Sequence, residues 1–247
     1  MTDTSQHRTA IVTGAGRRVG AEIARALIAD GWSVIAHVRS GEDSVVDGAV
    51  GVAADLAEPG CAQMIFAAAA GLPPVRLLVN NAARFERDGF GAFEAREFDA
   101  HMAVNVRAPL QLTEQFAAAQ DGGGDALVVN LLDAKLAAPN PDFLSYTLSK
   151  QALAGLTELA ARALAPKGIR VNGIAPALML RSAGQSEENF AAMRRANPLR
   201  REVEPGDVIA ALRYLIASPA VTGEVLTIDS GQRFWSLERD VQFLETE

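Results

Sequence analysis

The chain has 247 residues, of which 49% are hydrophobic and 21% charged, and its formal net charge is −7. This is the composition of a globular protein with one large core, and the negative charge argues against a nucleic-acid partner. The single cysteine, Cys61, excludes an intrachain disulfide, and the three histidines lie far apart in the sequence, so we expect no metal site.

Short apolar runs alternate with longer helical patterns along the chain, which is typical of βαβ units on a parallel sheet. The expected strands are 9–12, 33–37, 51–54, 75–79, 126–131, 170–174 and 225–228. The expected helices are 19–30, 59–70, 97–119, 145–165 and 206–217. We therefore predict an α/β fold over residues 1–247: a single-domain, Rossmann-type doubly wound parallel sheet of about seven strands, with helices on both faces.

Two segments lack a clear period. Residues 39–47 are too few for a full crossover helix, so we expect mostly loop there. Residues 179–205 contain four arginines after position 193 and little regularity. Loops of this length in compact domains are often lids or binding segments, so we predict a substrate-side loop, with a solvated surface excursion as the alternative.

The first expected strand runs into the segment 13–20, TGAGRRVG, and a helical pattern follows at once. Glycines let backbone N–H groups approach a pyrophosphate, and a helix N-terminus favours negative charge. A plain tight turn would look similar, but the position between a strand and a helix favours a dinucleotide site. We predict cofactor contacts at Gly14, Arg17, Arg18 and Val19.

The end of the second strand indicates which cofactor is bound. An NAD-binding chain usually has a carboxylate there for the adenosine ribose hydroxyls. This chain has His37, Arg39 and Ser40 instead, and Arg18 is expected to reach them from the phosphate loop. A guanidinium binds phosphate through paired, charge-assisted hydrogen bonds. We therefore predict NADP(H), with Arg39 as a solvated loop residue being the alternative.

At this point the sequence resembles the short-chain dehydrogenase/reductase family over nearly its whole length. The segments that carry the resemblance are 13–20, Asp55-Leu56, Asn80-Asn81-Ala82, Asn105, Tyr146-x-x-x-Lys150, 170–172 leading to Pro176, Thr222-Gly223 and Asp229-Ser230-Gly231. The resemblance implies further cofactor contacts at Asp55, Leu56, Asn81, Ala82, Tyr146, Lys150 and Pro176.

The tyrosine and the lysine of this motif are four residues apart, so Tyr146 and Lys150 share one face of a helix. An ammonium beside a phenol favours the phenolate, so we expect the pKa of Tyr146 to be lowered. Tyr146 would then exchange a proton while the nicotinamide carries hydride. The resemblance implies that Lys150 also holds the nicotinamide ribose and that Asn105 extends the proton route through water.

The chain departs from the family pattern at Asp133, where a serine usually stands thirteen residues before the tyrosine. An ionised carboxylate cannot donate a hydrogen bond to a carbonyl, and it opposes phenolate formation. It is useful where a substrate presents N–H groups or needs a ring nitrogen protonated. With Arg18 and Phe85, this resembles the pteridine reductases and dihydromonapterin reductases, whose phenylalanine stacks on a flat pterin.

The predicted catalytic residues are therefore Asp133, Tyr146, Lys150 and Asn105, and the predicted substrate contacts are Arg18, Phe85, Asp133 and Tyr146. The leading interpretation is an NADPH-dependent pterin or dihydropterin reductase. A reductase of ketones, quinones or acyl thioesters is the alternative, because residues 177–180 are apolar and Ala83 replaces a serine common in pteridine reductases. A protein that only senses NADP(H) is disfavoured by the intact catalytic motif.

Location and assembly are also expectations. Residues 1–9 lack the apolar stretch of a secretory signal, and no apolar run approaches the roughly 18–20 residues that cross a bilayer. We expect a cytoplasmic protein without a membrane partner. The resemblance implies a homo-oligomer, a tetramer or a dimer, formed through the helices at 97–119 and 145–165.

Overall fold

A seven-stranded parallel sheet forms the centre of the protein in the computed structural model, which describes residues 8–122, 124–181, 184–235 and 237–244. Its strands lie in the order β3-β2-β1-β4-β5-β6-β7, and every neighbouring pair is parallel. Their bounds are β1 Thr9–Val12, β2 Ser33–Val38, β3 Val50–Ala53, β4 Val75–Asn80, β5 Ala126–Leu131, β6 Ile169–Pro176 and β7 Val225–Ile228. The prediction of a Rossmann-type parallel sheet is confirmed.

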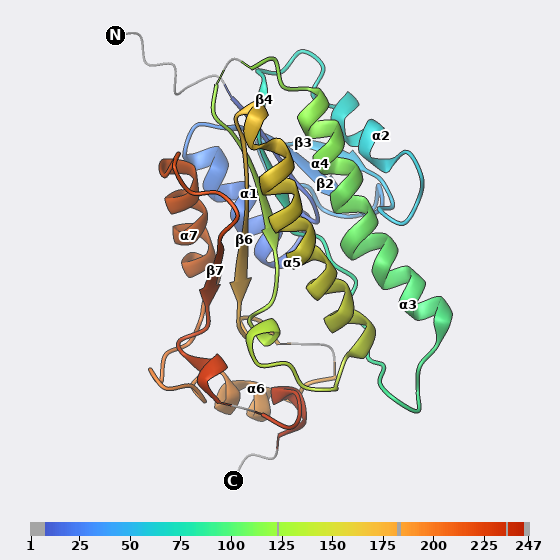
Figure 1. Cartoon of the computed structure of the whole chain (residues 1–247), viewed down its shortest axis with the longest axis vertical. Helices are drawn as coiled ribbons and strands as arrows, with labels where there is room; N and C mark the ends of the chain where they lie inside the picture. The colour runs from blue at the N-terminus through green and yellow to red at the C-terminus, as the bar shows by residue number, and fades with distance from the viewer. Residues whose placement is uncertain (1–7, 123, 182–183, 236, 245–247) are drawn as a thin grey trace.

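Helices cover both faces of this sheet (Figure 1). Their bounds are α1 Arg18–Ala29, α2 Cys61–Ala67, α3 Ala95–Met102, α4 Ala108–Ala118, α5 Leu144–Leu164, α6 Glu187–Met193 and α7 Pro205–Ala217. One apolar cluster lies beneath α1 and α7, and a second lies beneath α2, α4 and α5. The central strands β1, β4, β5 and β6 are buried between these two layers, which explains why their sequences read as apolar runs.

The strand order reverses between β1 and β4, because β2 and β3 extend to one side and β5, β6 and β7 to the other. In open parallel sheets, ligands bind beyond the carboxyl ends of the strands at such a switch point. The carboxyl end of β1 leads into the glycine-rich loop at Gly14, and that of β5 leads to Asp133. The topology therefore brings the predicted cofactor and catalytic residues to one edge of the sheet.

The predicted helix over 97–119 is instead three segments. α3 is followed by a π-helical turn, Ala103–Arg107, and then by α4. Pro109 explains the break, because it lacks the N–H that would bond to the carbonyl of Asn105 and its ring crowds that carbonyl. Short π segments inside α-helices occur frequently at functional sites, and this one holds Asn105.

The two segments that lack a regular hydrophobic pattern, 39–47 and 179–205, differ in structure. Residues 39–47 form a loop, as predicted. Within 179–205 the prediction of a loop is partly wrong, because α6 lies there; residues 182 and 183 fall outside the described part of the chain. The Ser186 hydroxyl caps α6 by accepting the Asn189 backbone N–H at 3.1 Å. The Asn189 side chain donates to the carbonyls of Val241 and Leu244.

The C-terminal turns thus lie beside α6, beyond the carboxyl ends of β6 and β7 (Figure 1). A contact between residues more than fifty positions apart gives no local periodicity, which is why sequence reasoning missed α6. Within the described part of the chain, a search for a helix long and apolar enough to span a membrane found none.

Candidate active site

The glycine-rich loop is held in place by the residues that follow β4. The Thr13 hydroxyl accepts the backbone N–H groups of Asn81 and Ala82, each at 3.0 Å, and Asn81 Nδ2 donates to the Thr13 carbonyl at 2.8 Å. Gly14 has a φ of +65° and so requires a residue without a Cβ. A Cβ at Gly20 would collide with the Gly14 carbonyl and lie 2.5 Å from Asn81 Nδ2.

The start of α1 beside this loop offers hydrogen-bond donors for a phosphate group. α1 begins at Arg18. In the described structure the side chain of its N-cap residue, Arg17, makes no capping hydrogen bond to the first turn. The free backbone N–H groups of the first turn can therefore donate to an anion. The chemistry of the loop suits the pyrophosphate of a dinucleotide, and the contacts at Gly14 and Val19 stay predictions.

His37 positions this loop from beneath. Its ring is 2% exposed; Nδ1 accepts the Gly14 backbone N–H at 3.1 Å and Nε2 lies 2.8 Å from the Ala54 carbonyl. Burial lowers the pKa of His37, so the ring is neutral and Nε2 carries the proton. Both ring nitrogens are therefore engaged with the backbone, and the contact of His37 with the cofactor stays a prediction.

The loop after β2 presents the predicted site for the 2′-phosphate. The Arg39 side chain is 77% exposed, and its Nε lies 3.6 Å from Asp55 Oδ2. The Ser40 backbone N–H donates to Asp43 at 2.9 Å. That N–H is the main reason why the pKa of Asp43 is lowered, and the Arg17 guanidinium contributes. Arg17 and Arg39 thus supply positive charge here, together with a carboxylate at Asp43 that sequence reasoning did not single out.

Arg18 points elsewhere. Its guanidinium donates to the carbonyls of Leu180 and Arg181, at 3.4 and 3.3 Å. The expectation that Arg18 converges on Arg39 and Ser40 is wrong, because Arg18 itself has a left-handed backbone with φ of 54° and its side chain turns toward the loop after β6. Arg18 lines the substrate-side cavity described below, which is where a substrate contact, also predicted for this residue, would lie.

Replacing Arg39 by alanine tests the 2′-phosphate site. We expect Arg39→Ala to weaken NADPH binding by about 1–3 kcal/mol, because a charge-assisted hydrogen bond to phosphate is lost, and to leave NADH binding unchanged. Fluorescence titration of both cofactors measures this. Arg25→Ala, which removes an exposed guanidinium paired with Glu22, is the matched control. Equal affinity of the unmodified protein for NADH and NADPH would contradict the assignment.

Tyr146 and Lys150 are buried on α5; Lys150 makes a polar contact with the last residue of β5, and Tyr146 makes one with the turn that follows this strand. The Tyr146 hydroxyl donates to Asp133 Oδ2 at 2.8 Å, and Lys150 Nζ donates to the Leu131 carbonyl at 2.6 Å. Asp133 Oδ1 accepts the backbone N–H of Lys135 at 2.8 Å and so caps a short 3-10 turn. A carboxyl group therefore lies directly beside the tyrosine hydroxyl.

The electrostatics correct one expectation. Burial, followed by the Asp133 carboxylate, raises the pKa of Tyr146 well above its usual value, whereas the sequence predicted a lowered pKa. Lys150 does not offset this effect, because its Nζ donates to the Leu131 carbonyl and not to the tyrosine hydroxyl; burial lowers the pKa of its ammonium to about 8. Burial also raises the pKa of Asp133. Tyr146 is thus a neutral phenol, and the carboxyl group of Asp133 has an increased tendency to hold a proton. Both groups are therefore suited to donate a proton.

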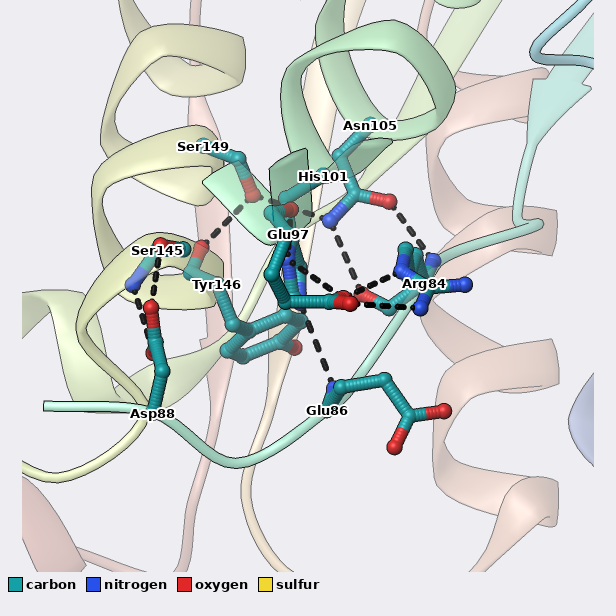
Figure 2. Close-up of polar contacts among 9 residues, drawn as sticks. All are labelled: Arg84, Glu86, Asp88, Glu97, His101, Asn105, Ser145, Tyr146 and Ser149. Atoms are coloured by element: carbon teal, nitrogen blue, oxygen red, sulfur yellow. Dashed lines mark hydrogen bonds and ion pairs between the residues drawn. The ribbon is translucent and has the colours of Figure 1, made fainter. Parts of the chain in front are cut away.

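Asn105 fixes the surroundings of Tyr146 (Figure 2). Its Nδ2 donates to the Arg84 carbonyl and to Ser149 Oγ, both at 2.9 Å, and its Oδ1 accepts the Arg84 backbone N–H at 2.7 Å. The Ser149 hydroxyl in turn donates to the Tyr146 carbonyl. The Asn105 side chain therefore ties the segment after β4 to α5.

Six further residues, none of which was predicted as a site residue, make polar contacts that hold the same segment (Figure 2). Arg84 pairs with Glu97, with Nη2 2.8 Å from Oε2, and His101 Nε2 accepts the Glu86 backbone N–H at 3.2 Å. Asp88 accepts both the backbone N–H and the hydroxyl of Ser145. His101 is fully buried, and this network fixes the backbone on both sides of Phe85.

Phe85 belongs to an aromatic group beside the catalytic tyrosine. Its ring stacks on Phe143 with centroids 4.3 Å apart, and it meets the Tyr146 ring edge-on at 4.6 Å. Phe85 is nevertheless 40% exposed and lines the cavity. Phe85 is therefore not a fully packed core residue, and its stacking on a substrate stays a prediction.

All four predicted substrate contacts line a cavity of about 320 Å³. The predicted residues that line it are Arg18, Val19, Asn81, Phe85, Asp133, Tyr146, Lys150 and Pro176. The predicted residues outside its lining are Gly14, Arg17, His37, Arg39, Ser40, Asp55, Leu56, Ala82 and Asn105. The Leu56 side chain instead packs in the core with Cys61.

One wall of the cavity was not predicted. It consists of residues from the C-terminal segment, namely Gln232, Arg233, Trp235, Leu237, Asp240 and Val241. These residues follow the last strand and show no motif, so the sequence carries no local signal for their role. Their position depends on the folded contacts with α6 and with the turn after β5.

Comparisons with known proteins identify the family of the chain. A sequence model of the family described as enoyl-(acyl carrier protein) reductase matches residues 14–233. An uncharacterized oxidoreductase of Mycobacterium tuberculosis is 35% identical, covering 94% of each chain. The chain therefore belongs to the short-chain dehydrogenase/reductase family and is an oxidoreductase.

Two other similar proteins are reductases whose names indicate different substrates. The crystal structure of FolM alternative dihydrofolate reductase 1 from Brucella canis, complexed with NADP, is 34% identical, has a TM-score of 0.87, and covers 95% of this chain and 97% of its own. Carbonyl reductase [NADPH] 2 from Sus scrofa is 29% identical and covers 90% of this chain and 95% of its own.

Proposed function

We propose that this short-chain reductase, which uses NADP(H), reduces a pterin or dihydropterin. The observation that carries the proposal is the 2.8 Å hydrogen bond between Tyr146 Oη and Asp133 Oδ2 at the wall of the cavity. A carboxyl in this position suits a substrate that contains ring nitrogens. The similarity to the Brucella FolM reductase supports the same substrate class.

Different residues of the site would donate the proton, stabilise the charge that remains and hold the cofactor. The bound nicotinamide supplies the hydride. Asp133 and Tyr146 share a hydrogen bond and together hold the proton for a ring nitrogen of the substrate. When Asp133 gives up its proton, the Lys135 N–H and the nearby Lys150 stabilise the carboxylate that remains, and solvent returns the proton. Lys150, buried and anchored to the Leu131 carbonyl, also lies where it can hold a ribose hydroxyl.

The residues that line the cavity suit a flat ring. Phe85 offers an aromatic surface, and the loop of residues 177–180 supplies an apolar wall. Aromatic stacking contributes about 0.5–1.5 kcal/mol beyond area burial. The competing candidate is a carbonyl reductase, which the apolar wall and the similarity to the Sus scrofa enzyme favour.

Replacing Asp133 by serine separates the two candidates. We expect Asp133→Ser to lower kcat/KM for a dihydropterin by at least tenfold, about 1.4 kcal/mol of transition-state stabilisation, because the proton donor is lost. Reduction of a ketone or quinone should be unchanged or faster, since a serine hydroxyl donates to a carbonyl oxygen. NADPH oxidation is measured for the unmodified and variant proteins with each substrate.

Two results serve as controls. NADPH affinity should be the same in Asp133→Ser and in the unmodified protein, which shows that the fold is intact. Phe85→Ala should impair the pterin reaction while leaving cofactor affinity intact. An unmodified protein that reduces a simple ketone but no pterin would overturn the proposal in favour of the carbonyl reductase.

We also propose a cytoplasmic homo-oligomer that uses α4 and α5. Leu110, Leu148 and Leu159 remain exposed on these helices, and a second copy of the chain would bury them. Sedimentation velocity measures the oligomeric state directly.

A further inference from the structure

Asp240, on the C-terminal segment, brings a second carboxylate into the cavity that contains Asp133. It lies ninety residues beyond Lys150, and no motif in the sequence connects it to catalysis. Its side chain is 17% exposed, and its Oδ2 lies 3.2 Å from Lys135 Nζ. Asp240 Oδ1 accepts the Gln242 backbone N–H at 3.1 Å, which holds the carboxylate from its other side.

Lys135 links the two carboxyl groups. Its backbone N–H donates to Asp133 Oδ1 at 2.8 Å, and its ammonium contacts Asp240 while also donating to the Asp142 carbonyl at 2.6 Å. Asp142 in turn accepts the Asp240 backbone N–H at 2.8 Å and pairs with Arg239. The distance between Asp240 and the catalytic centre is therefore set by fixed contacts on the turn after β5.

We propose that Asp240 is a positioning residue of the active site, whose negative charge, held by Lys135, keeps Asp133 in the protonated form that donates to a substrate nitrogen. The proposal rests on the proposed function for the role of Asp133. In the described structure the charged and titratable groups around Asp133 are Tyr146 and Lys150 on α5, Lys135 on the same turn and Asp240 on the C-terminal segment. Arg18 and Arg233 also line the cavity.

The balance of these groups gives the sign of the effect. After burial, which is the largest cause, Asp240 acts to raise the pKa of Asp133, whereas the Lys135 N–H, Tyr146 and Lys150 act to lower it. Arg233 is paired with Asp229 at 2.9 Å, and Arg18 donates to two carbonyls. Removing the charge of Asp240 should therefore lower the pKa of Asp133 and deplete its protonated form. Removing the ammonium of Lys135 should do the opposite.

The test measures the protonation of Asp133 without any substrate. The side-chain carboxyl carbons of isotope-labelled aspartates are titrated by NMR in the NADP-bound protein, and Asp133→Asn assigns the signal. We expect Asp240→Asn to move the midpoint for Asp133 to lower pH and Lys135→Met to move it to higher pH. The variant with both changes should fall between the two.

These substitutions preserve the local structure. Asparagine caps a helical turn about as well as aspartate, and methionine keeps the stem of the lysine and its backbone N–H. Asp30→Asn, which removes one negative charge beyond α1 at the opposite edge of the sheet, is the matched control and should leave the midpoint where it is. A purely structural Asp240 would give the same midpoint in Asp240→Asn and the unmodified protein, and that result would overturn the inference.

The pH dependence of pterin reduction provides the second readout. The alkaline limb of kcat should move to lower pH in Asp240→Asn and to higher pH in Lys135→Met. If the midpoints move as expected while no pterin is reduced, the proposed function fails and the positioning role of Asp240 stands. If pterins are reduced but the midpoints do not move, the positioning role fails alone.

Discussion

Tyr146→Phe is expected to lower kcat by about 10²–10⁴-fold and to leave NADPH affinity unchanged. Tyr146 is buried, and its hydroxyl makes one hydrogen bond, to Asp133 Oδ2 at 2.8 Å. Removing that hydroxyl takes away a proton donor while the ring keeps its edge-on contact with Phe85 at 4.6 Å. The fold and the cofactor site should therefore survive the loss of activity.

The measurement combines steady-state kinetics with titration of NADPH into the variant. Tyr214→Phe is the matched control, because Tyr214 is exposed on α7, outside the lining of the catalytic cavity, and its hydroxyl should be dispensable. Near-normal turnover of Tyr146→Phe on the true substrate would show that the proton comes from another group. The neighbouring Asp133 would then be the first residue to test.

Much of the fold could be predicted because its signals are local. The strands of the sheet centre are short apolar runs, and both of their faces are buried. The tight glycine-rich turn after β1 could be predicted because glycine is required where backbone segments touch, as at Gly14 and Gly20. These requirements act on consecutive residues and are therefore visible without a structure.

The features that were missed depend on contacts between distant residues. α6 is held by the bonds of Asn189 to the C-terminal segment, and Asp240 reaches the cavity through Lys135. The π turn at Asn105 has a local cause in Pro109, and the proline inside an apparently continuous helix was a signal that could have been used. Its effect on the position of Asn105 nevertheless appears only in the fold.

The pKa of Tyr146 shows why a motif alone does not give the electrostatics of a site. The sequence contained two opposing effects, the ammonium of Lys150 and the carboxylate of Asp133. The structure decides between them, because Asp133 is in hydrogen-bond contact with the phenol whereas Lys150 Nζ donates to the Leu131 carbonyl. Burial adds to the effect of Asp133. The reversal agrees with the direction of the proposed reaction, in which the tyrosine has a proton to give.

Gly20→Ala is expected to abolish most cofactor binding and to destabilise the protein by about 1–3 kcal/mol or more. The new methyl group would collide with the Gly14 carbonyl and crowd Asn81 Nδ2 at 2.5 Å. Neither neighbour can yield freely. Gly14 N–H donates to His37, and Asn81 Nδ2 donates to the Thr13 carbonyl, so both are fixed by the contacts that shape the phosphate loop. Relieving the collision must displace α1 from the loop and misplace the N–H groups that would hold a pyrophosphate.

Gly206→Ala is the matched control for this substitution. Gly206 lies in the first turn of α7 as Gly20 lies in the first turn of α1, but no described heavy atom comes within 4 Å of a Cβ at this position. The same substitution should therefore be neutral or stabilise by at most about 1 kcal/mol, since alanine is the better helix former. Thermal unfolding with and without NADPH distinguishes the two variants: the cofactor should raise the Tm of Gly206→Ala and leave that of Gly20→Ala nearly unchanged. A normal NADPH-induced shift in Gly20→Ala would mean that the loop does not bind the pyrophosphate, and the cofactor site would have to be sought elsewhere along the carboxyl edge of the sheet.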